Sequence, residues 1–222
     1  MTEISASRLA LVTGASRGLG FALAAALGAR GWHVLAVART VGGLEELDDR
    51  IKAAGGSATL APMNVTEAGA MEHLAGSIGA RGGGLGLWVH AAIHAAPLSP
   101  ASHIDAKEME KSIATNLRAP AMLIPLLDPL LRAGSGAALF LDDPRAGAKF
   151  FGTYGATKAA QIALARSWQA ETARIGPRVL IETPRPMATA TRARFFPGED
   201  RTPLADIHEE AARILDRVLA AN

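Results

Sequence analysis

The stretch Arg8-Leu-Ala-Leu-Val-Thr-Gly-Ala-Ser-Arg-Gly-Leu-Gly20 joins a short apolar run to a glycine-rich turn. Residues 9–12 have the length and apolarity of a strand that is buried on both faces, and apolar residues recur at helical spacing over residues 21–30. Glycine lets backbone N–H groups approach a ligand closely, and the N-terminus of a helix carries partial positive charge. The stretch therefore predicts a strand, a turn suited to a pyrophosphate, and a helix.

The spacing of the glycines distinguishes this turn from the commonest dinucleotide fingerprint. Gly14, Gly18 and Gly20 follow the pattern Gly-x-x-x-Gly-x-Gly, whereas that fingerprint is Gly-x-Gly-x-x-Gly. Glycines alone are a weak indication of a ligand, because a tight turn between a strand and a helix also uses them. A turn without a ligand is therefore the alternative at this point.

Composition limits the class of protein. Hydrophobic residues make up 49% of the 222 residues and charged residues 20%, a balance that is typical of a globular domain and excludes a disordered chain. The chain has 23 lysine and arginine residues against 21 aspartate and glutamate residues, a net charge of only +2, and the basic residues are scattered along the sequence. We therefore expect one domain over residues 1–222, without nucleic acid as a partner.

Two further features concern metals and membranes. The chain has no cysteine, which excludes a thiolate metal site, and we expect no metal. Residues 1–7 are too short and too polar for a secretory signal, and the apolar region 119–131 is interrupted by three prolines and Asp128. We therefore expect a cytoplasmic protein that does not bind a membrane.

Apolar runs alternate with amphipathic segments along the rest of the chain, which predicts parallel strands, right-handed crossovers and helices on both faces of a sheet. We expect an α/β fold: a doubly wound, Rossmann-like parallel sheet in three αβα layers with strand order 3-2-1-4-5-6. Prolines predict a kink within residues 119–131, and residues 82–84 predict a flexible connection. The strands are expected at residues 9–12, 32–39, 57–65, 85–92, 137–141 and 179–181, and the helices at 21–30, 44–54, 67–80, 105–117, 119–131, 153–175 and 207–221.

A second informative stretch is Tyr154-Gly-Ala-Thr-Lys158. Residues four apart share a helix face, so the phenol and the ammonium can face the same cleft. A nearby cation lowers the pKa of a tyrosine, and such a tyrosine suits proton transfer to a carbonyl. Taken alone, this pair is more often an ordinary surface pair.

Together, the segment from Thr13 to Gly20, Asn116 and the pair Tyr154 and Lys158 resemble the short-chain dehydrogenase/reductase family over about residues 8–194. The resemblance implies that Tyr154 exchanges a proton with substrate while hydride moves to or from a nicotinamide. It implies that Lys158 holds the nicotinamide ribose and lowers the tyrosine pKa, and that Asn116 anchors a water in a proton relay.

The resemblance also implies a cofactor-binding set. The glycine turn would hold the phosphates and ribose, Asn64-Val65 would lie beside the adenine, and Thr189 would contact the nicotinamide carboxamide. The full set is Gly14, Ser16, Arg17, Gly18, Leu19, Gly20, Arg39, Asn64, Val65, Ala91, Ala92, Tyr154, Lys158, Pro184 and Thr189.

The residue after the second strand bears on cofactor choice. A carboxylate there accepts hydrogen bonds from the adenosine ribose, whereas a basic residue accommodates a 2′-phosphate. Here the residue is Arg39, with Arg17 in the glycine turn and no carboxylate in residues 38–43. We therefore expect NADP(H) rather than NAD(H). The alternative is that both arginines are ordinary solvated side chains.

Two departures from the family affect the strands beside the site. The family's Asn-Asn-Ala-Gly after the fourth strand is replaced by residues 90–93, and we expect His90 and His94 to be packed or hydrogen-bonded rather than acid/base groups. Asp143, or with less support Asp142, stands where the family has a serine that binds the substrate carbonyl. A carboxylate near Tyr154 would raise its pKa and oppose Lys158.

A third departure lies near the end of the sequence. Residues 207–221 are predicted to form a helix, where the family continues into a seventh strand that supports subunit contacts. The sequence therefore does not determine the number of subunits. Arg185 replaces the glycine of the family's Pro-Gly segment, and residues 195–197 are expected either to form a substrate lid or to pack in the interior. By analogy, a homo-oligomer, a dimer or tetramer, is expected.

The first hypothesis is an NADP(H)-dependent short-chain oxidoreductase that acts on a small carbonyl or alcohol, with Tyr154, Lys158, Asn116 and Asp143 in the catalytic site. The second is a cofactor-binding sensor or scaffold with little dehydrogenase activity, which the carboxylate at Asp143 and the altered residues 90–93 motivate.

Overall fold

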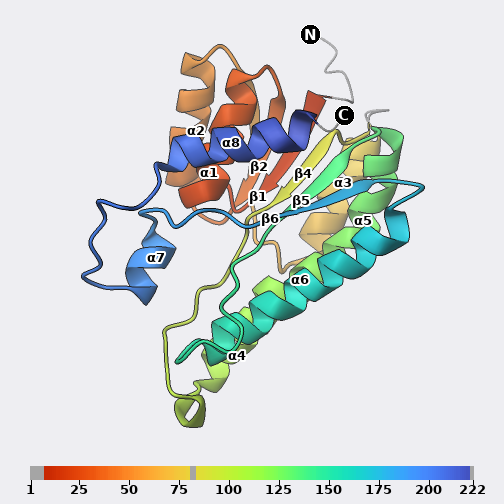
Figure 1. Ribbon diagram of the computed structural model, residues 1–222. Helices are drawn as coiled ribbons and strands as arrows, with labels where there is room; N and C mark the ends of the chain where they lie inside the picture. The colour runs from red at the N-terminus through yellow and green to blue at the C-terminus, as the bar shows by residue number, and fades with distance from the viewer. Residues whose placement is uncertain (1–7, 81–83, 221–222) are drawn as a thin grey trace.

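The structure, a computed structural model, describes residues 8–80 and 84–220. The strands in these residues form one six-stranded parallel sheet in the predicted order β3-β2-β1-β4-β5-β6 (Figure 1). The order confirms that the chain winds outward from β1 in one direction and then crosses to β4 to wind in the other. The strands are β1 (Leu9–Thr13), β2 (His33–Ala38), β3 (Ser57–Pro62), β4 (Leu87–His90), β5 (Ala137–Leu141) and β6 (Arg178–Glu182).

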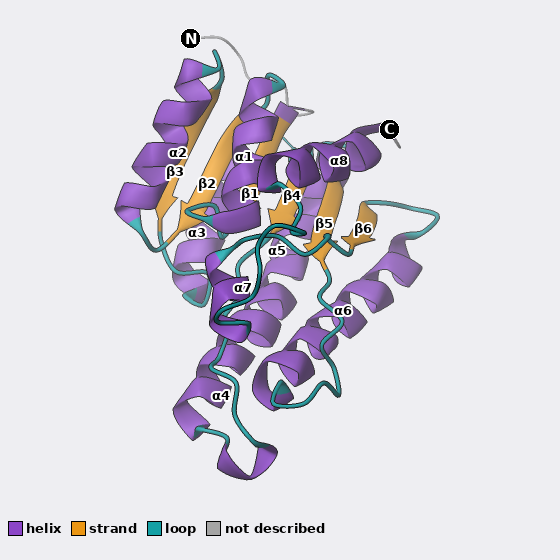
Figure 2. Cartoon of the chain, turned by 60° about the vertical axis from the view of Figure 1, so that its left-hand side comes forward, coloured by secondary structure: helices purple, strands orange, loops and turns teal. Residues whose placement is uncertain are grey.

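Helices cover both faces of the sheet, as the alternation of apolar and amphipathic segments predicts (Figure 2). The helices α1, α2 and α8 contribute buried residues to one core, and α3, α5 and α6 contribute to the other. This is the expected three-layer αβα arrangement. The helices are α1 (Gly18–Ala29), α2 (Val41–Ala53), α3 (Ala68–Ala80), α4 (Ala106–Ser112), α5 (Ala119–Ala133), α6 (Gly152–Thr172), α7 (Ala190–Phe195) and α8 (Ile207–Ala220).

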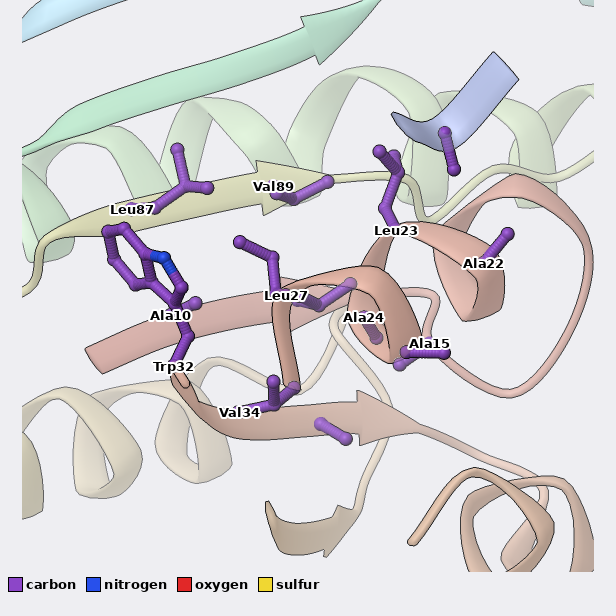
Figure 3. Packing of buried hydrophobic residues seen from close by; sticks show 14 of the residues in the cluster. Ala10, Ala15, Ala22, Leu23, Ala24, Leu27, Trp32, Val34, Leu87 and Val89 are labelled. Atoms are coloured by element: carbon purple, nitrogen blue, oxygen red, sulfur yellow. The ribbon is translucent and has the colours of Figure 1, made fainter. Parts of the chain in front are cut away.

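The central strand β1 is buried on both faces because successive side chains point to opposite sides of the sheet. Ala10 and Val12 belong to the core under α1, and Leu11 belongs to the opposite core. Leu23 and Leu27 of α1 pack over β1, β2 and β4 (Figure 3). Burying a leucine side chain contributes about 1.5–3 kcal/mol, so this continuous apolar contact fixes where α1 starts and hence where the glycine turn lies.

Several predicted boundaries differ from the structure. The third and fourth strands are shorter than expected, because the chain leaves the sheet before Val65 and Ala92 and enters loops at the site. The two expected helices are continuous, because a π-helical segment, Ile113–Arg118, joins α4 directly to α5. Pro125 and Pro129, on which the predicted kink rests, lie inside α5. Of the expected flexible connection, residues 82 and 83 lie outside the described residues.

Two short elements are not predicted by the sequence. A 3-10 turn spans Ala101–His103, and α7 lies between β6 and α8. Of residues 195–197, for which a lid or interior packing was expected, only Phe195 belongs to α7. The expected C-terminal helix is confirmed as α8, which packs against α1. Within the described ranges, no helix is both long and apolar enough to cross a membrane.

Candidate active site

A groove opens at the carboxyl ends of the strands, where the chain winding reverses between β1 and β4. Ligands bind at this place in doubly wound sheets. Every cofactor-binding residue that the sequence predicts lines this groove, as does Asp143, whereas Asn116 lies behind its wall. The structure thus brings together Gly14, Ser16, Arg17, Gly18, Leu19, Gly20, Arg39, Asn64, Val65, Ala91, Ala92, Tyr154, Lys158, Pro184 and Thr189.

The glycine turn lies tightly against the chain that follows β4. Gly14 has a φ of +80°, and a Cβ at this position would lie 2.6 Å from the Ala92 nitrogen. A Cβ on Gly20 would lie 2.3 Å from the Gly14 carbonyl oxygen. A side chain at either position would therefore displace the turn, because neither neighbour is a flexible side chain.

Gly18 differs from these two glycines, because a Cβ built on it meets no heavy atom within 4 Å. The helix α1 begins at Gly18, and its N-cap residue, Arg17, makes no capping hydrogen bond through its side chain. The first N–H groups of a helix need an acceptor, and an anion satisfies them well. The turn therefore fits the pyrophosphate of a dinucleotide.

Arg17 and Arg39 are exposed and line one end of the groove. Within the described part of the chain, neither guanidinium makes a hydrogen bond or an ion pair with another residue. Asn64 and Val65 line the same region, and the Asn64 side chain accepts a hydrogen bond from the Thr66 backbone N–H at 3.2 Å. Two unpaired cations at this end of the groove favour an anionic group of the ligand.

At the other end of the groove, α6 presents Tyr154, which is only 4% exposed. Its hydroxyl donates a hydrogen bond to Asp143 Oδ2 at 3.0 Å, and Asp143 Oδ1 accepts from Arg145 Nε at 3.1 Å. The carboxylate thus connects the phenol with a guanidinium. Asp142, the alternative considered from the sequence, lies instead 3.9 Å from Arg166.

The pKa of Tyr154 lies well above its usual value of 10.0, chiefly because burial disfavours the phenolate and because Asp143 repels it. The Arg145 charge opposes this increase only in part. The effect of Asp143 agrees with the sequence-based expectation. The lowering of this pKa that we expected from Lys158 does not prevail, and the phenol is therefore protonated at neutral pH.

Lys158 lies one helical turn after Tyr154 and is also buried. Its Nζ donates to the side-chain oxygen of Gln161 at 2.7 Å. Burial lowers the pKa of Lys158 to about 8, while the charges of Asp142 and Asp143 act in the opposite direction. Lys158 is therefore a cation near neutral pH, but it can lose its proton under mildly alkaline conditions.

Asn116 lies in the π-helical segment and is fully buried. Its side chain accepts from the His94 backbone N–H at 2.7 Å and donates to the His94 carbonyl and to Thr157, each at 3.0 Å. Its backbone carbonyl accepts a hydrogen bond from Gln161 Nε2 at 2.9 Å. Asn116 thus braces the chain after β4 instead of lining the groove.

The two histidines at the end of β4 and in the loop after it, His90 and His94, are packed or hydrogen-bonded, as we expected. His90 is 1% exposed, and its Nδ1 lies 2.9 Å from the Thr13 hydroxyl. Burial lowers the pKa of His90 to about 3, so it is neutral. His94 Nε2 lies 2.8 Å from Glu108.

The short helix α7 closes the groove beside the phenol. The Phe195 ring is buried, with its centroid 4.8 Å from that of Tyr154 and 5.0 Å from that of Phe151. The Arg145 guanidinium lies over the Phe196 ring, with its Cζ 5.3 Å from the ring centroid. Of the two roles considered for residues 195–197, interior packing is confirmed for Phe195.

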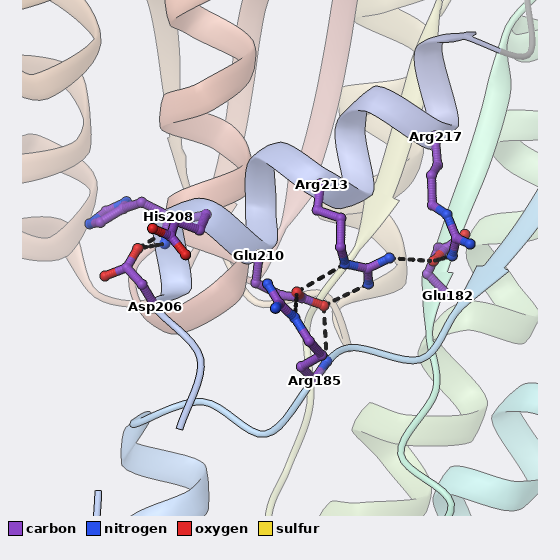
Figure 4. A network of polar contacts seen from close by, with 8 residues as sticks. Glu182, Arg185, Asp206, His208, Glu210, Arg213 and Arg217 are labelled. Carbon is purple, nitrogen blue, oxygen red and sulfur yellow. Dashed lines mark hydrogen bonds and ion pairs between the residues drawn. The ribbon is translucent and has the colours of Figure 1, made fainter. Parts of the chain in front are cut away.

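A polar network attaches the loop after β6 to α8 (Figure 4). Glu210 is fully buried and accepts from Arg185 through its backbone N–H at 2.9 Å and its Nε at 2.6 Å. It also pairs with Arg213 at 2.6 Å. Hydrogen bonds from Arg213, followed by those from Arg185, outweigh the effect of burial and lower the pKa of Glu210 to about 2.

Three residues of this region were not identified as site residues from the sequence: Arg145, Gln161 and Glu210. Arg145 lies close to both Asp142 and Asp143 in the sequence, but only the geometry of the loop shows that it pairs with Asp143. Gln161 has a readable signal, because it lies three residues after Lys158 and hence on the same helix face.

A parallel sheet with a glycine turn at its switch point, and a tyrosine and a lysine facing the same groove, defines a dinucleotide-binding oxidoreductase fold. The profile of the family described as short chain dehydrogenase matches residues 8–200. This chain therefore belongs to the short-chain dehydrogenase family.

Individual relatives agree with this assignment. The chain is 30% identical over 168 residues to a fatty acyl-CoA reductase of Acinetobacter baylyi. The matched region makes up 74% of this chain but only 57% of the length of that reductase. A 3-ketoacyl-ACP reductase from Sinorhizobium meliloti superposes with a TM-score of 0.81 at 27% identity, over 95% of this chain and 91% of that one. An alcohol dehydrogenase from Thermococcus sibiricus complexed with 5-hydroxy-NADP has a TM-score of 0.83 over 97% and 91%, and its 24% identity shows the fold alone.

Proposed function

We propose that this chain is an NADP(H)-dependent oxidoreductase that interconverts a carbonyl compound and an alcohol. The observation that carries the proposal is the placement of Tyr154 and Lys158 on one face of α6, lining the same groove as the glycine turn. A nicotinamide bound in that groove would supply or accept the hydride. We further propose one domain over residues 1–222, a cytoplasmic location and, by analogy with the family, a homo-oligomer.

The proposed preference for NADP(H) rests on Arg17 and Arg39. Both guanidiniums lie at one end of the groove without an ion-pair partner among the described residues, and no carboxylate replaces them in residues 38–43. A 2′-phosphate would pair with such cations, whereas an adenosine ribose hydroxyl would not require them.

In the proposed reaction, the Tyr154 hydroxyl gives its proton to the oxygen of the substrate carbonyl. The hydrogen now directed at Asp143 would turn toward that oxygen. Burial and Asp143 keep the phenol protonated at neutral pH, so its proton is available for a carbonyl oxygen, but the raised pKa makes Tyr154 a weak acid. We therefore propose carbonyl reduction, which needs a protonated Tyr154, as the half of the reaction to assay first. Lys158 would hold the nicotinamide ribose.

Asp143 distinguishes this site, because an ionised carboxylate cannot donate a hydrogen bond to the substrate oxygen. Negative charge develops on that oxygen during reduction, and Asp143 would repel it. Arg145 reduces this repulsion because its Nε binds the other oxygen of the same carboxylate. The site is therefore proposed to be active but slower than the same site with a hydroxyl at this position.

The substrate is proposed to be a small carbonyl compound with an apolar portion. Ile93, Met187, Phe195 and Phe196 line the groove near Tyr154 and provide apolar surface. The names of the Acinetobacter baylyi and Sinorhizobium meliloti relatives include acyl groups, which makes acyl-derived carbonyl compounds a suitable first set of test substrates.

The alternative is a cofactor-binding sensor or scaffold, which the hydrogen bond from Tyr154 to Asp143 favours because it occupies the proton donor. Stopped-flow absorbance of NADPH with a panel of aldehydes, ketones and acyl thioesters separates the two functions. We expect turnover in the wild type and a loss of about 10²–10⁴-fold in Tyr154→Phe. NADPH binding without turnover of any substrate would establish the sensor instead.

A further inference from the structure

The side chain of Gln161 lies between the Lys158 ammonium and the backbone carbonyl of Asn116. It is fully buried in α6. Its oxygen accepts from Lys158 Nζ at 2.7 Å, and its nitrogen donates to the Asn116 backbone carbonyl at 2.9 Å. One amide therefore connects the lysine at the groove with the helix behind it.

We propose that Gln161 is a positioning residue that holds the Lys158 ammonium at the wall of the groove. Gln161 does so from its place between Lys158 and the Asn116 carbonyl. The inference rests on the proposed function, because it assigns Lys158 to the cofactor. Gln161 does not line the groove and acts only through Lys158.

The surroundings of Lys158 explain why such a residue is needed. A lysine side chain has four flexible methylene groups, and a buried ammonium needs acceptors to offset the loss of water. The charged and titratable groups that face it are Asp142 and Asp143 from the loop after β5 and neutral His90 from β4. Neither aspartate forms a hydrogen bond with Nζ, whereas Gln161 does.

The chemistry of the Gln161 amide allows it to hold the Lys158 ammonium but not to transfer protons. Unlike an ionisable group or a water molecule, a glutamine side chain does not titrate near neutral pH. Gln161 can therefore fix the position of the ammonium, but it does not carry protons between Lys158 and Asn116. A proton that Tyr154 gives away must then be replaced from the groove side, where Asp143 contacts the phenol.

The titration of Lys158 in the full chain without cofactor tests the proposal directly. The chain has only five lysines, so ¹³Cε-lysine labelling gives a simple spectrum, and Lys158→Arg identifies the resonance. Gln161→Met has a similar volume but offers no amide oxygen, and it should lower the pKa of Lys158 below the wild-type value. Gln161→Glu supplies a charged acceptor and should raise it.

Gln169→Met is the matched control, because Gln169 lies on the same helix and donates to the Val179 carbonyl at 2.6 Å, away from Lys158. It should leave the Lys158 pKa unchanged. Binding of NADPH gives the second readout: at neutral pH, Gln161→Met should weaken it about tenfold, as expected for a hydrogen bond to a charged group. Gln161→Glu should keep most of the affinity.

An unchanged Lys158 pKa in both Gln161 variants would overturn the proposal. A shifted pKa with wild-type NADPH affinity in Gln161→Met would also overturn it, because Lys158 would then not need to be held for the cofactor. If the wild type itself does not bind NADPH, the proposed function fails, whereas the pKa measurement still decides whether Gln161 holds Lys158.

Discussion

The glycine turn and the loop between β5 and α6 line different parts of one groove, and they differ in how they are built. In the turn, Gly14 and Gly20 act through their lack of a side chain, because a Cβ would meet backbone atoms. In the loop, Asp143 and Arg145 act through their side chains, which bind each other and Tyr154.

This difference separates what is fixed from what can change. A backbone turn that packs against backbone tolerates little variation, so this end of the groove keeps the features that fit a dinucleotide. The loop exchanges one polar side chain for another while the strand and helix around it stay in place. The fold thus secures the cofactor site, whereas the reactivity depends on a few replaceable contacts.

The largest expected effect comes from a substitution that tests whether the glycine turn depends on the absence of a side chain. Gly20→Ala places a Cβ 2.3 Å from the Gly14 carbonyl oxygen, so the turn must shift. We expect an unfolding free energy lower by about 3 kcal/mol and NADPH binding weaker by more than about 100-fold. Urea unfolding and isothermal titration calorimetry measure the two effects.

Gly76→Ala in α3 is the matched control, because a Cβ there has open space. It should stabilise the protein by about 0.5–1 kcal/mol and leave cofactor affinity unchanged. Equal NADPH affinity in the two variants would show that the turn does not hold the cofactor.

A smaller effect concerns the attachment of the loop after β6 to α8. The pKa of Glu210 is lowered from 4.5 to about 2, so its pairs with Arg185 and Arg213 stabilise the protein fully above pH 4.5 and lose this effect as the pH falls through about 2. Glu210→Gln should lower the unfolding free energy at neutral pH by about 2 kcal/mol and reduce the loss of stability in acid.

Guanidinium unfolding at several pH values measures this dependence. Glu209→Gln, an exposed neighbour in α8, should change the stability by less than about 0.5 kcal/mol. If Glu210→Gln and the wild type lose stability equally on acidification, Glu210 is not the group that titrates.

The smallest of these effects tests whether the cofactor is NADP(H) rather than NAD(H). Arg39→Ala should weaken NADPH binding about tenfold and leave NADH binding nearly unchanged, because only the former has a 2′-phosphate. Fluorescence titration with both cofactors measures the ratio. Arg174→Ala removes an exposed arginine just beyond α6 and serves as control. An unchanged ratio in Arg39→Ala would exclude Arg39 as the phosphate contact.

The fold could be predicted from the sequence because its determinants are local and periodic. The glycine turn after β1 and the alternation of strands and helices were enough for the strand order. The neighbourhood of Asp143 and Tyr154 could also be predicted, since one follows a strand end and the other begins the next helix.

Contacts between distant segments could not be predicted in the same way. Arg185 and Glu210 are separated in sequence by α7 and the loop that follows it, and no pattern pairs one arginine with one glutamate among many. Gln161 reaches the Asn116 carbonyl only because the π-helical segment and α6 pack side by side. Such contacts depend on tertiary packing, which residue spacing does not encode.

Titration of the phenol tests the central claim that Asp143 keeps a buried Tyr154 protonated at the cofactor groove. Tyr154 is the only tyrosine in the chain, so the ultraviolet absorbance of tyrosinate reports on this group alone. We predict that the wild type shows no tyrosinate until alkaline unfolding, that Asp143→Ser ionises at lower pH while folded, and that this variant reduces carbonyl substrates faster. A wild-type phenol that titrates near its usual pKa of 10.0 in the folded protein would contradict the account.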